Sequence, residues 1–158
     1  MKTLLIPVAV ATALLATTAQ AACPSVPTAQ RFSISADGTE VTDKQTKLIW
    51  RRCSEGQSWS GTTCTGTATT MAHEAALKLA RDQGPWRLPD VDELNSLADK
   101  GCKNPAIDAT AFPGTLSDWY WSSSPLVGLA GSAWVVLFYD GSVLFSDNAA
   151  VRLVRASQ

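Results

Sequence analysis

The segment Trp86-Arg87-Leu88-Pro89-Asp90-Val91-Asp92-Glu93-Leu94 contains a well-formed helix start, and the rest of the chain can be interpreted outward from it. Asp90 and Glu93 have the spacing of a capping box, in which each side chain accepts a hydrogen bond from the other residue's backbone N–H. The residues that follow place apolar side chains at helical spacing: Val91, Leu94, Leu97 and Ala98. Gly101 is a typical residue for the end of such a helix. The segment therefore predicts a helix that begins directly after Asp90.

A second helix is predicted just before this segment, over residues 71–82. Its apolar stripe also has helical spacing and consists of Ala72, Ala75, Ala76, Leu79 and Ala80. Thr70 is the expected N-cap, because a threonine hydroxyl can accept a hydrogen bond from a free N–H in the first turn. The pair Gly84-Pro85 cannot continue a helix and ends it.

Strand-forming segments lie on both sides of the two helices. Those before the helices are residues 32–34, 40–43 and 48–51, and those after them are 119–123, 133–138, 143–145 and 151–155. Residues 133–138 are apolar on both faces, which predicts a strand with a neighbour on each side. Asp140-Gly141 is a hairpin turn signal. Strands, then helices, then strands predict an α+β fold with an antiparallel sheet and two helices.

The first 21 residues have the pattern of a secretory signal peptide. Lys2 is followed by the apolar run 4–16, which is shorter than a membrane-spanning helix, and then by the small residues of Ala19-Gln20-Ala21. Cleavage after Ala21 would leave one domain, residues 22–158. The chain has no second apolar run of membrane length, so we expect no membrane span after processing.

The predicted signal peptide also indicates the cellular location of the processed protein. A lipoprotein is the alternative, because Cys23 lies near the cleavage point, but Gln20 occupies the position where a lipoprotein signal carries a Leu-like residue. We therefore expect an exported protein of the periplasm, the cell surface or the extracellular space.

The four cysteines, Cys23, Cys53, Cys64 and Cys102, all lie beyond the leader. An even number of cysteines in an exported chain predicts two disulfides, for which three pairings are possible. We favour Cys53–Cys64, which closes a polar, Gly-containing loop, and this pairing leaves Cys23–Cys102. A metal site is the competing interpretation, but the chain has no CxxC motif and its only histidine is His73.

Charge and composition exclude several function classes. The chain carries 13 Lys and Arg residues against 14 Asp and Glu, a net charge of −1, so we expect no nucleic-acid partner. A single histidine and the absence of a Gly-x-Ser-x-Gly motif give no basis for nucleophilic catalysis, and we predict neither enzymatic activity nor a cofactor. Asp90, Asp92 and Glu93 could bind calcium, but a position in the first turn of a helix explains them without a metal.

Four residues are candidate ligand contacts: Trp59, Trp119, Tyr120 and Arg152. An aromatic ring can stack on a sugar ring, and Trp59 is the better surface candidate because it lies in a polar loop. Trp119 and Tyr120 belong to a predicted strand and point to opposite faces. Arg152, with Arg87 and Arg155, could bind an anion. For these arginines we favour structural pairing with Asp92, Glu93 or Asp140 over anion binding.

A series of short blocks gives the chain a resemblance to a known family. The blocks are Asp37-Gly38-Thr39 with Leu48-Ile49-Trp50, Trp86-Arg87-Leu88-Pro89 with Asp92-Glu93-Leu94, Asn104-Pro105-Ala106-Ile107 with Phe112-Pro113, Trp121-Ser122-Ser123-Ser124, Ala133-Trp134, Asp140-Gly141, and Val151-Arg152-Leu153-Val154-Arg155. In order and spacing they resemble the DUF1566 family, also called the Lcl C-terminal domain after a collagen-like adhesin. The resemblance covers nearly all of residues 22–158. Within these blocks we expect structural roles for Trp86, Arg87, Leu88, Pro89, Trp121, Trp134 and Arg155.

The resemblance implies a C-type-lectin-like fold and a secreted, periplasmic or cell-surface binding module that is adhesin-like and carbohydrate-binding. The adhesin's domain is a trimer that binds sulfated glycosaminoglycans, but this chain lacks a collagen-like stalk and a net positive charge, which argues against polyanions. The expected partner is a glycan or another envelope protein. The alternative is a structural or assembly subunit of a surface appendage or envelope complex, for which a homo-oligomer would be natural.

Overall fold

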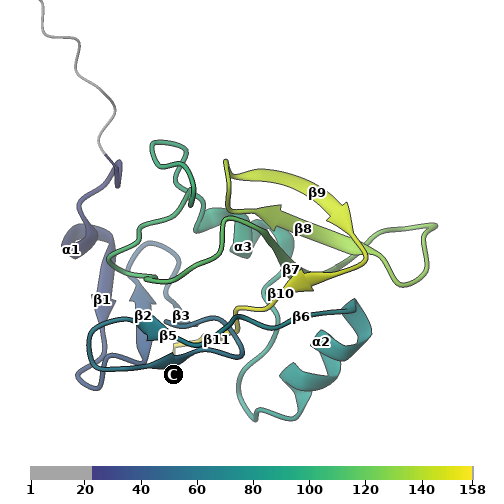
Figure 1. Ribbon diagram of the computed structural model, residues 1–158, viewed down its shortest axis with the longest axis horizontal. Coiled ribbons are helices and arrows are strands. Elements are labelled where there is room, and N and C mark those ends of the chain that lie inside the picture. The colour runs from purple at the N-terminus through teal and green to yellow at the C-terminus, as the bar shows by residue number, and fades with distance from the viewer. Residues whose placement is uncertain (1–22, 158) are drawn as a thin grey trace, which may run out of the picture.

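The structure is a computed structural model that describes residues 23–157 (Figure 1). The predicted signal peptide, residues 1–21, lies outside the described residues. Within them the chain forms an α+β fold of mostly antiparallel sheets with a few short helices, as the order of sequence signals predicts. None of the helices in residues 23–157 is both long enough and apolar enough to cross a membrane.

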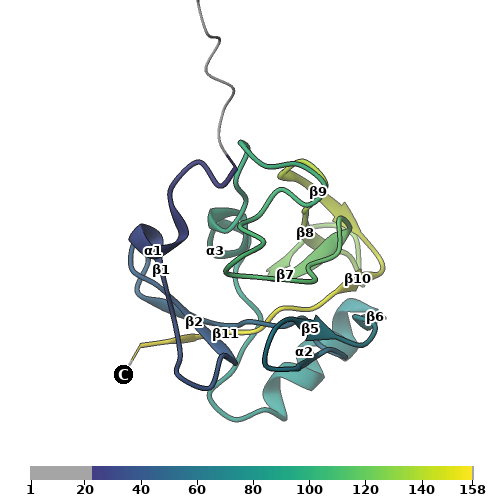
Figure 2. The same ribbon diagram turned by 60° about the vertical axis from the view of Figure 1, so that its left-hand side comes forward.

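The first sheet has the order β1-β2-β3-β11 and is antiparallel throughout. Its strands are β1 (Phe32–Ile34), β2 (Glu40–Asp43), β3 (Leu48–Arg51) and β11 (Val154–Ala156). The first three have the predicted bounds. The last strand of the chain pairs with β3, so the C-terminal end of the domain lies beside its N-terminal strands (Figure 2).

The second sheet has the order β6-β10-β7-β8-β9. Its strands are β6 (Thr70–Met71), β7 (Trp119–Pro125), β8 (Ala133–Leu137), β9 (Ser142–Ser146) and β10 (Ala149–Ala150). Strand β8 lies between β7 and β9, as its apolar character predicts, and β9 forms the outer edge. The pairing of β10 with β7 is parallel, which the sequence did not predict. A small third sheet pairs β4 (Ser58–Trp59) with β5 (Cys64–Thr65).

The helices are α1 (Thr28–Arg31), α2 (His73–Arg81) and α3 (Val91–Ser96). The capping box of α3 is confirmed: the N–H of Glu93 donates to Asp90 Oδ1 at 2.8 Å, and the N–H of Asp90 donates to Glu93 Oε2 at 2.8 Å. The N-cap predicted for α2 is wrong. Thr70 lies in β6, and the helix instead begins after Ala72, whose side chain makes no capping hydrogen bond.

Two clusters of buried residues cover opposite faces of the second sheet, because neighbouring residues of a strand point to opposite sides. One cluster contains Leu94 and Leu97 of the α3 region with Tyr120 and Val136 of the sheet. The other contains Ala76 and Ala80 of α2 with Trp121 and Val135. The two helices predicted from apolar periodicity therefore lie on the two sides of one sheet. The predicted stripe of α2 is only partly correct, because Ala72 and Ala75 are exposed and His73 is buried beside Ala76 and Ala80.

Two disulfides hold this arrangement together, with the pairings that the sequence favoured. Cys53 joins Cys64 across 11 residues, with 5.5 Å between the Cα atoms, and Cys23 joins Cys102 across 79 residues. The first closes the loop that carries β4 and β5. The second ties the start of the described chain to the segment after α3.

Candidate functional site

A polar hollow of about 240 Å³ lies at the end of β3, next to the Cys53–Cys64 disulfide. Its lining residues are Thr39, Arg51, Cys53, Ser54, Glu55, Gln57, Ser58 and Trp59. Larger hollows of about 630 and 440 Å³ lie along α2. We treat the smaller one as the candidate site, because it combines polar groups with the partly exposed ring of Trp59. The largest hollow is lined mainly by apolar atoms, and the tryptophan of the 440 Å³ hollow, Trp86, is buried.

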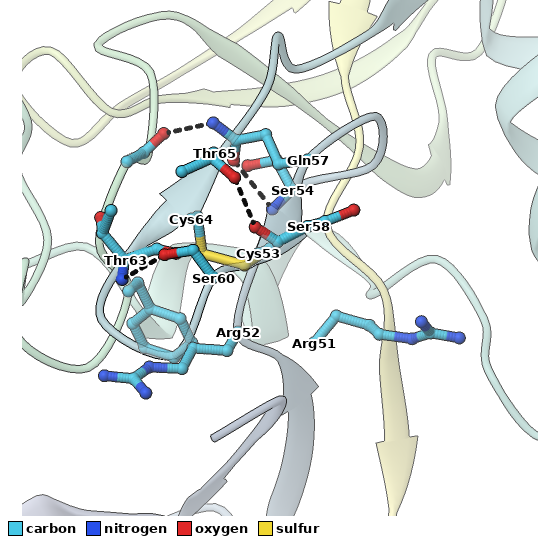
Figure 3. The surroundings of a disulfide bond; sticks show 12 residues. Arg51, Arg52, Cys53, Ser54, Gln57, Ser58, Ser60, Thr63, Cys64 and Thr65 are labelled. Atoms are coloured by element: carbon cyan, nitrogen blue, oxygen red, sulfur yellow. Dashed lines mark hydrogen bonds between the residues drawn. A yellow bond between two sulfur atoms is a disulfide. The ribbon is translucent and has the colours of Figure 1, made fainter. Parts of the chain in front are cut away.

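The local backbone explains how these side chains come together. Arg51 and Arg52 are neighbours at the end of β3, so they point to opposite sides of the chain (Figure 3). The disulfide follows directly, and the N–H of Gln57 then donates to the carbonyl of Ser54 at 3.0 Å to close a turn. Gly56 has a φ of 87°, and a Cβ there would lie 2.4 Å from Thr69 Oγ1, so the turn requires glycine.

Trp59 is held rigidly at one wall of the site. The guanidinium of Arg52 lies 3.9 Å from the centroid of its ring, a cation–π contact. Gly38 gives the ring room, because a Cβ at this position would lie 2.4 Å from Trp59 Nε1. Trp59 is half-buried, so these contacts leave part of the residue exposed to a ligand.

Arg52 is itself fixed by backbone carbonyls. Its guanidinium donates to Ala111 O at 3.1 Å, to Thr110 O at 3.0 Å and to Gly38 O at 3.3 Å. Burial lowers the pKa of Arg52 from its ordinary value. This arginine therefore supports the tryptophan and is not a free cation for a ligand.

Opposite charges are linked at another wall. Arg51 Nη2 donates to Gln83 Oε1 at 2.9 Å, and Gln83 Nε2 donates to Glu55 Oε2 at 3.1 Å. The Arg51 guanidinium also lies 4.7 Å from the centroid of the Trp86 ring. The site thus presents a cation and an anion in fixed positions, a few residues apart in sequence and joined through one amide.

Gln57 is oriented by both ends of its amide, as Figure 3 shows. Its Oε1 accepts from the N–H of Ser54 at 3.2 Å, and its Nε2 donates to Gly114 O at 3.1 Å. Thr65 Oγ1 donates to Ser58 O at 3.3 Å across the small sheet. The polar rim is therefore preorganised by contacts to the disulfide loop and to residue 114.

Tyr120 and Arg152, two of the predicted ligand contacts, are fully buried, and this corrects the prediction that they meet a ligand at the surface. Both lie beneath the site, where Ser54 joins them. Ser54 Oγ is 2.7 Å from the Tyr120 hydroxyl and accepts from Arg152 Nη2 at 3.2 Å. They support the floor of the site from below.

Arg152 is held by neutral acceptors. Its guanidinium donates to the carbonyls of Arg51 and Arg52 and, at 2.7 Å, to Thr115 Oγ1. Its carbon Cζ lies 4.9 Å from the centroid of the Phe112 ring. Burial lowers the pKa of Arg152. None of the ion pairs among residues 23–157 includes it, so its positive charge is compensated by dipoles and rings alone.

Trp119, the fourth predicted contact, lies elsewhere. It is half-buried and lines a separate hollow of about 380 Å³ with Phe145 of β9. The structure therefore groups Trp59 with the supporting residues Tyr120 and Arg152, and it separates Trp119 from them.

The residues with expected structural roles lie at different depths in the structure. Four of them are buried: Trp86, Leu88, Pro89 and Trp121. Arg87 forms a two-bonded ion pair with Glu93 at 2.6 and 2.7 Å, and Arg155 pairs with Glu40 at 2.7 Å. Trp134 differs, since 36% of it is exposed on β8.

Sequence reasoning missed the polar members of the site. Arg51, Glu55 and Gln57 lie in or beside the disulfide loop, and the turn Glu55-Gly56-Gln57 was the available signal. Gln83 follows α2 and reaches the site only through tertiary structure. Among the described residues, no group of three or more His, Cys, Asp or Glu side chains is arranged to hold a metal ion.

A search of the curated proteins and a search of the solved structures found no match. The family model of the Lcl C-terminal domain matches residues 39–155, a range that includes the whole lining of the candidate site. The chain therefore belongs to the Lcl C-terminal domain family.

Proposed function

We propose that this protein is a non-catalytic binding module of the bacterial cell envelope and that it binds a glycan in the hollow beside Cys53–Cys64. Two disulfides are typical of proteins that work outside the cytoplasm. The observation that carries the proposal is the combination, in one hollow, of the fixed Trp59 ring with Arg51, Glu55 and Gln57.

This combination suits a sugar for a chemical reason. A sugar ring offers an apolar C–H face, which an aromatic ring can cover, and a rim of hydroxyl groups that both donate and accept hydrogen bonds. Glu55 supplies an acceptor and Arg51 a donor, and both are held by Gln83. Arg51 and Glu55 carry opposite charges and are joined through Gln83, so their charges offset each other. The site therefore favours a neutral sugar over a polyanion.

We further propose that the α+β arrangement is C-type-lectin-like, as the family resemblance implies. The two disulfides and the helices on both faces of the second sheet are compatible with this assignment. An experimental structure compared strand by strand with C-type lectins tests it, and a different strand order would overturn it.

A glycan array with the processed, oxidised domain tests the function. We expect binding to a neutral glycan, loss of that binding in Trp59→Ala, and retention in Trp119→Ala, since Trp119 lines another hollow. Glu55→Gln is a milder variant that keeps the size of the side chain and should weaken binding without loss of folding.

The controls separate binding from stability. Thermal melts of each variant should show that Glu55→Gln is as stable as the parent protein. Trp119→Ala should melt at a lower temperature, because Trp119 packs against a buried cluster, but it should remain folded at the temperature of the array. Absence of binding to every sugar on the array, at low and at high salt, would contradict the proposal, as would undiminished binding by Trp59→Ala.

The alternative function, a structural or assembly subunit, is favoured by one specific observation. The edge strand β9 carries the exposed apolar side chains Val143, Leu144 and Phe145. An uncovered apolar edge is the surface that an assembling protein offers to its partner.

A further inference from the structure

Strand β9 is an unprotected sheet edge. It pairs with β8 on one side, and no other strand of the described residues pairs with its outer side. In Figures 1 and 2 it forms the outer border of the second sheet. Natural proteins usually protect such an edge with charged residues, proline or a covering segment, because free N–H and C=O groups recruit other strands.

The side chains of β9 carry none of these protections. Val143, Leu144 and Phe145 are exposed by 36%, 44% and 57%, and they are flanked within the strand by serines. Leu144 points to one face of the sheet and its two neighbours point to the other. The edge is therefore apolar on both faces and uncharged over all five residues.

The neighbouring strand enlarges this apolar surface. Trp134 of β8 is 36% exposed and is the cross-strand partner of Phe145. Cross-strand neighbours share a face, so Trp134, Val143 and Phe145 lie on the same side of the sheet. Exposed apolar groups gathered in this way mark an interaction surface more often than scattered ones do.

The order of residues in β9 identifies the partner. The sequence Ser142-Val143-Leu144-Phe145-Ser146 is nearly the same in both directions. If a second copy of β9 pairs antiparallel about Leu144, Leu144 faces Leu144, Val143 faces Phe145, and Ser142 faces Ser146. Every apolar residue then meets an apolar residue.

The flanking charges fit the same register. Asp140 and Asp147 lie just outside the two ends of the strand. In an antiparallel pair centred on Leu144, Asp147 faces Gly141 of the other copy and Asp140 faces Asn148. No two carboxylates are therefore opposed, whereas like charges directly opposite each other would destabilise the pair.

We propose that the protein forms a two-fold symmetric dimer in which β9 of one copy pairs antiparallel with β9 of a second copy, centred on Leu144. The pairing joins the second sheets of the two copies into one continuous sheet and covers the free β9 edge of each copy. It is isologous, because each copy contributes the same surface. The glycan site lies at the end of β3 in the other sheet, so the dimer proposal stands independently of the proposed function.

Light scattering or sedimentation of protein exported and processed by a bacterial host tests the dimer. We expect twice the mass of one chain, with dissociation on dilution. Leu144→Lys and Leu144→Glu should each be monomeric, because each places two like charges together at the two-fold axis. An equimolar mixture of these two variants should return to the dimer mass, since Lys then faces Glu.

The matched control is Ile34→Lys, which places the same charge on an exposed aliphatic residue of β1, the edge strand of the other sheet. It should remain dimeric. Thermal melts should show unchanged folding of the Leu144 variants. A parent protein that is monomeric at every concentration would overturn the proposal, and so would Leu144→Lys and Leu144→Glu variants that each remain dimeric alone.

Discussion

At the scale of single residues, Arg152 shows how a buried cation can be kept without a carboxylate. Its Nη1 and Nη2 atoms donate to backbone carbonyls and to the hydroxyls of Ser54 and Thr115, its Nε has no hydrogen-bond partner, and the Phe112 ring covers it. Ser54 also lines the candidate site. The arginine therefore connects the stability of the core to the shape of the site.

We predict that Arg152→Met destabilises the protein by about 3 kcal/mol, because it leaves several buried acceptors without donors. Arg152→Lys should cost a similar amount, since an ammonium group cannot reach acceptors spread around a planar guanidinium. Denaturant unfolding measures both. A loss below about 0.5 kcal/mol, typical of a surface substitution, would contradict this role.

The ion pair between Arg87 and Glu93 makes the stability of the folded protein depend on pH. The pKa of Glu93 is lowered from its ordinary value, chiefly by hydrogen bonds from Arg87 and also by the backbone N–H of Asp90. A group whose pKa is lowered by folding stabilises the folded state above its unfolded pKa, near 4.5, and loses this contribution as the pH falls through its folded pKa.

We therefore expect the stability of the parent protein to fall more steeply below about pH 5 than that of Glu93→Gln, which has no carboxylate to protonate. Urea unfolding of both proteins along a pH series measures the difference. Parallel curves for the two proteins would show that the ion pair contributes nothing.

The residues of the site could be predicted only where the local sequence carried a signal. Trp59 was found because it lies in a polar loop, where an exposed aromatic residue indicates a binding surface. Tyr120 and Arg152 were assigned to the surface because local sequence does not reveal which face of a strand becomes buried. Gln83 joins Arg51 to Glu55 from a distant segment, and no local pattern indicates such a bridge.

At the scale of elements, local signals succeeded where no long-range contact opposed them. The capping box of α3 is self-contained, and the bounds of β1, β2 and β3 follow from residue type. Thr70 failed as an N-cap because β6 pairs with β10, almost 80 residues further along the chain, and extends the backbone there. The short strands β4 and β5 depend on the disulfide that closes their loop.

The α3 capping box provides an element-scale prediction. Asp90→Ala should destabilise the protein by about 1 kcal/mol, because it removes the acceptor of the Glu93 N–H. Asp90→Ser is the matched variant that keeps a capping oxygen and should recover most of this loss. Equal stability of the alanine and serine variants would show that the cap is unimportant.

At the scale of the whole molecule, the two disulfides have separate roles. Cys23–Cys102 closes a loop of 79 residues and Cys53–Cys64 a loop of 11. In the chain-entropy model, the longer loop contributes about 4.5 kcal/mol and the shorter about 3 kcal/mol. Only the shorter one borders the candidate site.

We predict that replacing Cys23 and Cys102 with serine costs more stability but leaves glycan binding intact at low temperature. Replacing Cys53 and Cys64 should cost less stability and reduce binding more, because the loop that carries Trp59 is no longer closed. Thermal melts and glycan titrations of the two double variants measure this difference. If the Cys23 and Cys102 double variant lost more glycan binding than the Cys53 and Cys64 double variant, the site would not depend on the disulfide beside it.

In the proposed function, a glycan contacts Trp59 beside the Cys53–Cys64 disulfide. The most direct measurement follows the tryptophan indole N–H signals by NMR as a glycan selected on the array is added. We predict that the Trp59 signal shifts with saturation, while those of the fully buried Trp50 and Trp121 stay in place. Saturable shifts confined to Trp119 or Trp134, with Trp59 unchanged, would show that the glycan binds elsewhere and would overturn the proposed site.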